Sequence, residues 1–200
     1  MLDVQNREDS RGIAIQRVGV KELRLPFLIK KQTGGYQQVL ARISFTVSLP
    51  MEFKGTHMSR FLEILLPWSE KPLAEEEMEA MLTEALDRLH AEAAEVTLAF
   101  TYFLEKKAPV SGRVSLLDVD ASFTGRKQRG ASMQFELGLA MPFTSLCPCS
   151  KEISAYGAHN QRSIARVRLR YREGVPCIYI EELAVLLEQQ GSAPIYPLLK

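Results

Sequence analysis

The chain has 200 residues, of which 46% are hydrophobic and 24% are charged, so it can bury one large core or two modest ones and is neither disordered nor fibrous. Its 25 Lys and Arg residues nearly balance 24 Asp and Glu residues, and the net charge of +1 creates no global field toward nucleic acid or an anionic membrane. Residues 1–9 lack an apolar signal core, and no later apolar run approaches the ~20 residues of a membrane span. We therefore expect a cytoplasmic protein with no nucleic-acid or membrane partner, in which a local basic cluster holds any anionic ligand.

Patterns of apolar residues predict the elements of the first half of the chain. Residues 37–49 alternate between apolar and polar and predict a long, half-buried strand that Pro50 ends. A short helix near residues 61–66 and a longer amphipathic helix over residues 72–94 follow. Residues 96–102 and 114–124 alternate again, which predicts an antiparallel hairpin around the turn at 109–112.

The second half of the chain repeats this order of elements. Residues 133–141 and 165–171 alternate as strands on either side of a cysteine-containing segment, and residues 180–190 have a helical pattern. The repeat predicts an α+β fold of two similar modules, each an antiparallel sheet with helices on one face. We divide the chain into an N-terminal segment (1–30), a first module (31–128) and a second module (129–200), which is one or two strands shorter than the first.

The segment between the last two predicted strands concentrates reactive side chains. It carries Cys147, Cys149, Lys151, His159 and Arg162. Thiolate and imidazole are a good ligand pair for zinc, and a site that leaves its other positions to water or substrate is catalytic rather than structural. One intervening proline is too tight a spacing for an easy disulfide, so the two sulfurs are expected to do different jobs. The alternative is an inert cysteine and a hydrogen-bonded histidine, and the residues alone leave both interpretations open.

A second polar segment, residues 54–61, lies at a predicted strand-to-helix junction. His57 and Arg60 stand there with a glycine that permits a tight turn, and the N-terminus of the following helix would favour a phosphate. The alternative is an ordinary helix start whose polar side chains are solvated.

Four arginines alternate along the strand predicted at residues 165–171, at positions 166, 168, 170 and 172. They predict an exposed or intersubunit face, with nucleotide binding as the second interpretation. Cys177 lies in an apolar stretch, which indicates core packing.

Several long motifs, in order along the chain, resemble the signature of the type IB GTP cyclohydrolases. The strongest are SLCPCSKEIS at residues 145–154 and GAHNQRS at residues 157–163, and the shorter ones are GTHMSRF at 55–61, APVSG at 108–112 and YPLLK at 196–200. The resemblance covers essentially the whole chain. It implies a tunnelling fold, in which subunits assemble into barrels with active sites at their interfaces, and we expect a homotetramer. The strand at residues 37–49 would then line the barrel.

The same resemblance implies an activity and a site. The activity is hydrolysis of GTP to 7,8-dihydroneopterin triphosphate and formate, which serves folate, queuosine or another pterin pathway. In the family, the residues matching Cys147 and His159 bind a catalytic metal, zinc or manganese, and the cysteine matching Cys149 lies beside the reacting centre. The expected contacts to the nucleotide and its triphosphate are His57, Arg60, Lys151 and Arg162. Such a metal activates water toward carbon 8 of the purine, and the phosphate charges require local cations.

The sequence departs from the family pattern at two places. Pro194 occupies the position of an acidic metal ligand of some members, so we expect a different metal shell. Members also continue past the lysine matching Lys200 into a segment with a purine-anchoring glutamate and a His-x-His pair, and a polypeptide ending at Lys200 is expected to turn over poorly. The alternatives are a shortened paralogue that binds nucleotide or assembles without turnover, and a relative of the same fold that acts on a pterin or a deazapurine nitrile.

Overall fold

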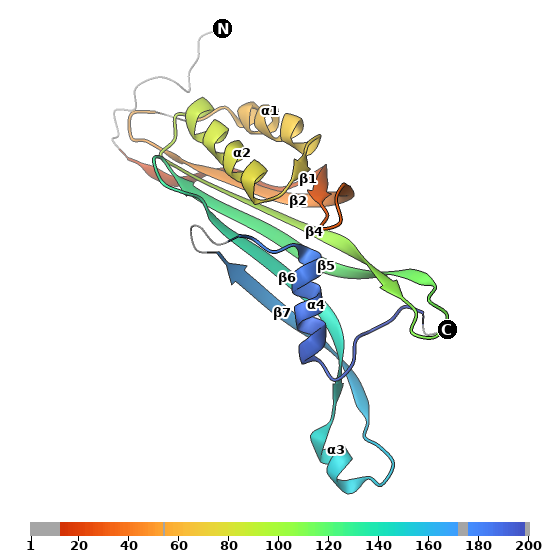
Figure 1. The fold of residues 1–200 in the computed structure, drawn as a ribbon. Helices are drawn as coiled ribbons and strands as arrows, with labels where there is room; N and C mark the ends of the chain where they lie inside the picture. Colours follow the sequence, from red (N-terminus) through yellow and green to blue (C-terminus); the bar gives the residue numbers. More distant parts are fainter. Residues whose placement is uncertain (1–12, 54, 172–175, 199–200) are drawn as a thin grey trace.

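The computed structural model describes residues 13–53, 55–171 and 176–198 and has an α+β fold (Figure 1). Its seven-stranded sheet has the order β3-β1-β2-β4-β5-β6-β7, antiparallel throughout except for the β1–β3 pair. The strands are β1 (Ile15–Lys30), β2 (Tyr36–Leu49), β3 (Pro72–Leu73), β4 (Ala93–Lys107), β5 (Val114–Gln128), β6 (Gln134–Leu146) and β7 (Asn160–Arg170). The helices are α1 (Met58–Ser69), α2 (Glu75–Arg88), α3 (Pro148–Ile153) and α4 (Ile180–Gln190).

The predicted strands and the helix at 180–190 are confirmed, and the long helix at 72–94 is shorter than predicted. Its first residues pair with β1 as β3, and its end is fixed at Arg88 by a Schellman motif. In that motif the Ala91 amide donates to the Leu86 carbonyl (3.0 Å), and His90 takes the left-handed conformation with φ 51°. Three elements were not predicted: β1, β3 and α3.

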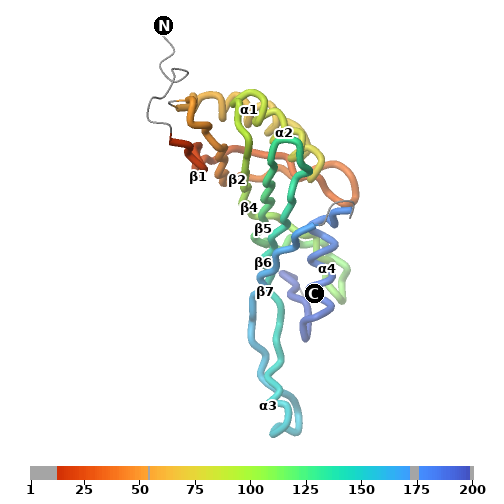
Figure 2. Tube along the Cα trace, turned by 90° about the vertical axis from the view of Figure 1, so that its left-hand side faces the viewer, coloured from red at the N-terminus to blue at the C-terminus, as the bar shows by residue number. Residues whose placement is uncertain are grey.

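Helices α1, α2 and α4 all cover one face of the sheet, as predicted (Figures 1 and 2). Alternate residues of β4 are buried beneath them, including Val96, Leu98 and Tyr102. The Tyr102 hydroxyl donates to Glu181 Oε1 of α4 at 2.6 Å, which joins the middle of the sheet to the last helix. The other face, which we call the open face, carries the polar residues of the alternation.

Strands β6 and β7 continue beyond the rest of the sheet as a two-stranded arm, residues 141–165, with α3 at its tip (Figures 1 and 2). The β5–β6 pairing ends at the Asp120–Ala140 pair, whereas the β6–β7 pairing runs to Leu146–Asn160. The arm therefore holds the predicted cysteine segment away from the core.

The strands on both sides of the predicted module boundary at residue 128 belong to the same sheet, because β5 pairs with β6 from Arg126–Gln134 onward. Residues 15–30, assigned above to an N-terminal segment, form β1 of that sheet. Within the described ranges, no helix is long and apolar enough to cross a membrane.

Candidate active site at the tip of the arm

The turn at the tip of the arm brings Cys147 and His159 together. The Cys147 amide donates to the His159 carbonyl at 3.2 Å, immediately beyond the last residue pair of the arm. Pro148 follows at the first helical position, where its fixed φ and missing N–H suit the start of a helix. The Lys151 amide then donates to the Cys147 carbonyl at 3.2 Å, so α3 begins directly after Cys147 and carries Cys149 in its first turn.

The surroundings of Cys147 lower the pKa of its thiol to about 7. The main cause is the Ser150 hydroxyl, which donates to the sulfur, and the amides of Ser150 and Cys149 add to it. Desolvation by burial opposes these effects, and the charge of His159, the last of the causes in size, lowers the pKa further. Much of Cys147 is therefore thiolate at neutral pH, which is the form that binds metals and acts as a nucleophile.

The other predicted residues of this segment also lie on the arm. Cys149, Lys151, His159 and Arg162 are exposed to solvent. In the part of the chain that the structure describes, no group of three or more His, Cys, Asp or Glu side chains could hold a metal ion. The arm thus supplies one thiolate and one imidazole, which are two of the three protein ligands usual for a catalytic zinc.

His57 and Arg60 lie elsewhere, at the start of α1. His57 is the N-cap residue, with φ −74° and ψ 115°, and the Arg60 amide donates to its carbonyl at 3.1 Å. Helix α1 packs against β1 and α2, at the opposite end of the molecule from α3 (Figure 1). Within one chain, these two residues therefore do not join the residues of the arm.

Two features beside the cysteine turn were not predicted from the sequence. Ser150 lies one helical turn after Cys147, a spacing that could have indicated its hydrogen bond. The segment after α4 lies along the arm: Thr144 accepts from the Ser192 amide (3.1 Å) and donates to the Ala193 carbonyl (2.9 Å). The Leu146 amide donates to Ser192 Oγ at 3.0 Å. This contact joins residues 46 positions apart, and no local pattern reveals it.

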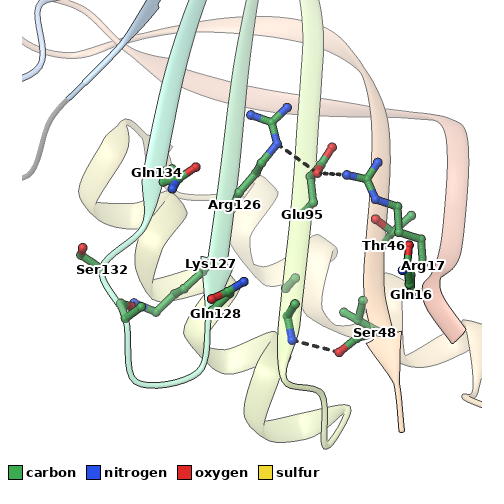
Figure 3. A pocket seen from close by; sticks show the side chains of 14 residues that line it. Gln16, Arg17, Thr46, Ser48, Glu95, Arg126, Lys127, Gln128, Ser132 and Gln134 are labelled. Carbon is green, nitrogen blue, oxygen red and sulfur yellow. Dashed lines mark hydrogen bonds and ion pairs between the residues drawn. The ribbon is translucent and has the colours of Figure 1, made fainter. Parts of the chain in front are cut away.

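A polar hollow of about 290 Å³ lies on the open face, away from the arm (Figure 3). At its centre, Glu95 Oε2 accepts from Arg17 at 2.5 Å and from Arg126 at 3.1 Å. None of the predicted site residues lines this hollow. Because its lining holds no thiol or imidazole, we place the candidate active site on the arm.

A family model described as type I GTP cyclohydrolase FolE2 matches residues 1–200. The chain belongs to the FolE2 family. It is 50% identical over 200 residues to the GTP cyclohydrolase FolE2 of Geotalea uraniireducens (strain Rf4), which is the whole chain and 72% of that relative. It is 48% identical over 198 residues to the FolE2 of Azoarcus sp. (strain BH72), 99% of the chain and 72% of that relative. The FolE2 of Geobacter metallireducens is 46% identical over 200 residues, 74% of its length.

FolE2 membership confirms the resemblance to GTP cyclohydrolases that the motifs indicated. In this FolE2 chain, the thiolate of Cys147 and the imidazole of His159 form a donor pair that suits a borderline metal. Lys151 and Arg162 add cationic heads on the same arm, which suit an anionic substrate.

Proposed function

We propose that this chain is a GTP cyclohydrolase I, which hydrolyses GTP to 7,8-dihydroneopterin triphosphate and formate for folate synthesis or another pterin-derived pathway such as queuosine synthesis. FolE2 membership over residues 1–200 supports the reaction. The observation that carries the assignment of the site is the arm turn, where Cys147, whose thiol has a lowered pKa, is hydrogen-bonded through its backbone to His159.

A divalent metal, zinc or manganese, is part of this proposal. Cys147 and His159 would hold it, and a thiolate suits zinc better than manganese. When bound, the metal would supply the Lewis acidity for attack of water on carbon 8 of the purine. The remaining positions of the metal would be filled by water, by the substrate or by another copy of the chain.

The chain's own residues have separate tasks in the proposed reaction. Cys149 is exposed on the turn that follows Cys147, where it would carry a proton to or from the opening imidazole ring. Lys151 and Arg162 would hold the triphosphate through charge-assisted hydrogen bonds, which fixes the purine relative to the thiolate.

We also propose that the sheet is one subunit's share of a tunnelling fold and that the protein is a homotetramer. Three observations support assembly. The arm projects from the body, and at its tip the side chains of Ile153 and Tyr156 are 89% and 102% exposed. Strand β7 is an edge strand of the sheet. His57 and Arg60 are separated from the arm of their own chain, so a second copy would have to bring them to it.

The test is to replace Cys147 by Ala and to measure metal content, formate release and pterin fluorescence. We expect the C147A variant to lose formate release and to hold less metal, since loss of one ligand weakens metal affinity. Cys177→Ala is the matched control, because Cys177 is half-buried beside Glu75 and distant from the arm in sequence. C147A with full metal content and activity would refute the assignment.

The same design applies to the imidazole. His159→Ala should behave like C147A, whereas His90→Asn should remain active, because Asn tolerates the left-handed conformation of His90. Equal loss in both histidine variants would indicate a general defect in folding and would contradict the role given to His159.

A second candidate function is a nucleotide-binding protein without turnover. It is favoured by the separation of α1, which His57 caps, from α3, which follows Cys147 (Figure 1). Equilibrium binding of GTP to metal-loaded protein, with no formate over hours, would select this alternative.

A further inference from the structure

The arginines that alternate along β7 stand on the open face of the sheet. Arg166, Arg168 and Arg170 are all exposed there. Their neighbours on β6 are Ala140, Gly138 and Glu136, in that order. The three guanidinium groups therefore have different surroundings, although their spacing in the sequence is uniform.

Glu136 neutralises one end of this row. The Glu136 side chain is only 10% exposed, and its carboxylate accepts from Arg170 Nε at 2.7 Å and lies 4.0 Å from Arg168 Nε. Arg166 lies instead beside Ala140, and among the described residues no carboxylate pairs with it. The positive charge of Arg166 therefore has no paired carboxylate in the part of the chain that the structure describes. The charge of Arg168 is only weakly compensated, because its side chain is 79% exposed and lies 4.0 Å from Glu136.

The open face of the sheet is concave beside Arg166 and Arg168, because the side chains there are small. A hollow of about 590 Å³ is lined by Arg166 and Arg168 and floored by residues that include Ser122, Gly138 and Ala140. A Cβ at position 138 would lie 2.3 Å from Ser122 Oγ, so glycine keeps the floor low. Within the described ranges, Asp120 is the only carboxylate in this lining, and one strand separates it from β7.

A second hollow of about 440 Å³ adjoins the first and shares Asp120 with it. Arg24 and Arg42 line its far side as direct partners across β1 and β2, and Glu22 lies 3.6 Å from Arg42. Among the described residues, four arginines along the two hollows thus face three carboxylates, those of Glu22, Asp120 and Glu136. The surface along these hollows therefore has a small local excess of positive charge, and the chain as a whole is nearly neutral.

We propose that the hollow beside β7 is a binding site for a linear oligophosphate, with Arg166 and Arg168 as its anchors. Residues two apart on a strand have Cα atoms about 7 Å apart and point to the same face, so the two long side chains can converge on one di- or triphosphate chain. Guanidinium forks match phosphate oxygens in pairs. The ligand is either a free oligophosphate or the tail of a nucleotide, since both present the same groups.

This site is separate from the candidate active site. His159 precedes Arg166 by seven residues along an extended chain, about 23 Å, and Arg162, the nearest residue of the candidate active site, precedes it by four residues, about 13 Å. The proposal therefore goes beyond the cyclohydrolase assignment, and it can be tested without turnover.

The test is calorimetric titration of the chain with inorganic tripolyphosphate at low salt. Replacing both anchors, Arg166→Gln with Arg168→Gln, should weaken binding on the order of 10- to 100-fold. The matched control is Arg88→Gln with Arg113→Gln, which removes the same charge from α2 and from the β4–β5 turn, and it should bind like the unaltered chain. Lysine at both anchor positions should give intermediate affinity, because it keeps the charge and loses the fork.

Three results would overturn the proposal. They are undiminished binding by the double anchor variant, equal weakening in the control variant, and equal affinity for monophosphate and tripolyphosphate. Parallel titration with GTP in the C147A background identifies the source of the ligand. Loss of GTP binding in the anchor variant points to a nucleotide tail, and loss of tripolyphosphate binding alone points to a free oligophosphate.

Discussion

The hydrogen bond between Tyr102 and Glu181 should contribute strongly to stability. Tyr102 is fully buried, and its hydroxyl donates to Glu181 Oε1 at 2.6 Å. Burial and the neighbouring carboxylate raise the pKa of this phenol well above its ordinary value, so the phenol remains a donor throughout the usual pH range. No donor among the described residues reaches Glu181 Oε2, which is also buried. Tyr102→Phe would therefore leave both carboxylate oxygens without a partner.

A hydrogen bond to a charged group contributes about 1.5–3 kcal/mol, so Y102F should lower the free energy of unfolding by about 2 kcal/mol. For a chain of this size, that corresponds to a Tm decrease of about 4–8 °C. Urea unfolding followed by far-UV circular dichroism measures the change. Tyr36→Phe, on the exposed side of β2, is the matched control and should stay within about 0.5 kcal/mol of the unaltered chain.

A double-mutant cycle separates this bond from other effects of the substitution. Tyr102→Phe combined with Glu181→Met removes both partners, and the double variant should be less destabilised than the sum of the single variants. If Y102F unfolds at the same urea concentration as the unaltered chain, or if the two effects simply add, the reasoning is refuted.

Three further predictions concern packing, pH and assembly. Gly125→Ala should cost about 1–2 kcal/mol of unfolding free energy, because its Cβ would lie 2.8 Å from two methionine sulfurs; an unchanged urea midpoint would contradict this. Lys127 donates to Glu79 and lowers its pKa, so the unaltered chain should exceed Glu79→Gln in stability near pH 7 by less than about 1 kcal/mol. That difference in stability should disappear as the pH falls through the lowered pKa of Glu79. Urea midpoints of the unaltered chain and of E79Q that still differ near pH 3 would contradict this prediction. Ile153→Ser with Tyr156→Ser should yield smaller species in light scattering over a dilution series, and an unchanged mass would exclude the arm from the interface.

The sequence predicted the elements that bury one face. Strands β2 and β4 alternate because the helices cover every second side chain, and α4 has a buried stripe. Strand β1 lacks a regular alternation, because Glu22 has φ 57° and the register shifts between Val20 and Leu23. Helix α3 has six residues and none is buried, so it leaves no periodic signal.

The site was predictable only where its residues are close in sequence. Cys147 and His159 flank one hairpin turn, and the strands on either side bring them together. The distance between this turn and His57 depends on where α1 packs, which spacing along the chain does not encode. The contact of Ser192 with the arm likewise depends on the path of the chain after α4.

The arm is not an independent appendage, because the chain after α4 is bonded to it. Ser192 and Ala193 exchange hydrogen bonds with Thr144, three residues before Cys147. The same chain leaves α4, which Tyr102 tethers to the centre of the sheet. A displacement of α4 along the sheet would therefore shift the thiolate at the tip of the arm relative to whatever is bound there, so the position of the reactive sulfur depends on the packing of a helix far from it in sequence.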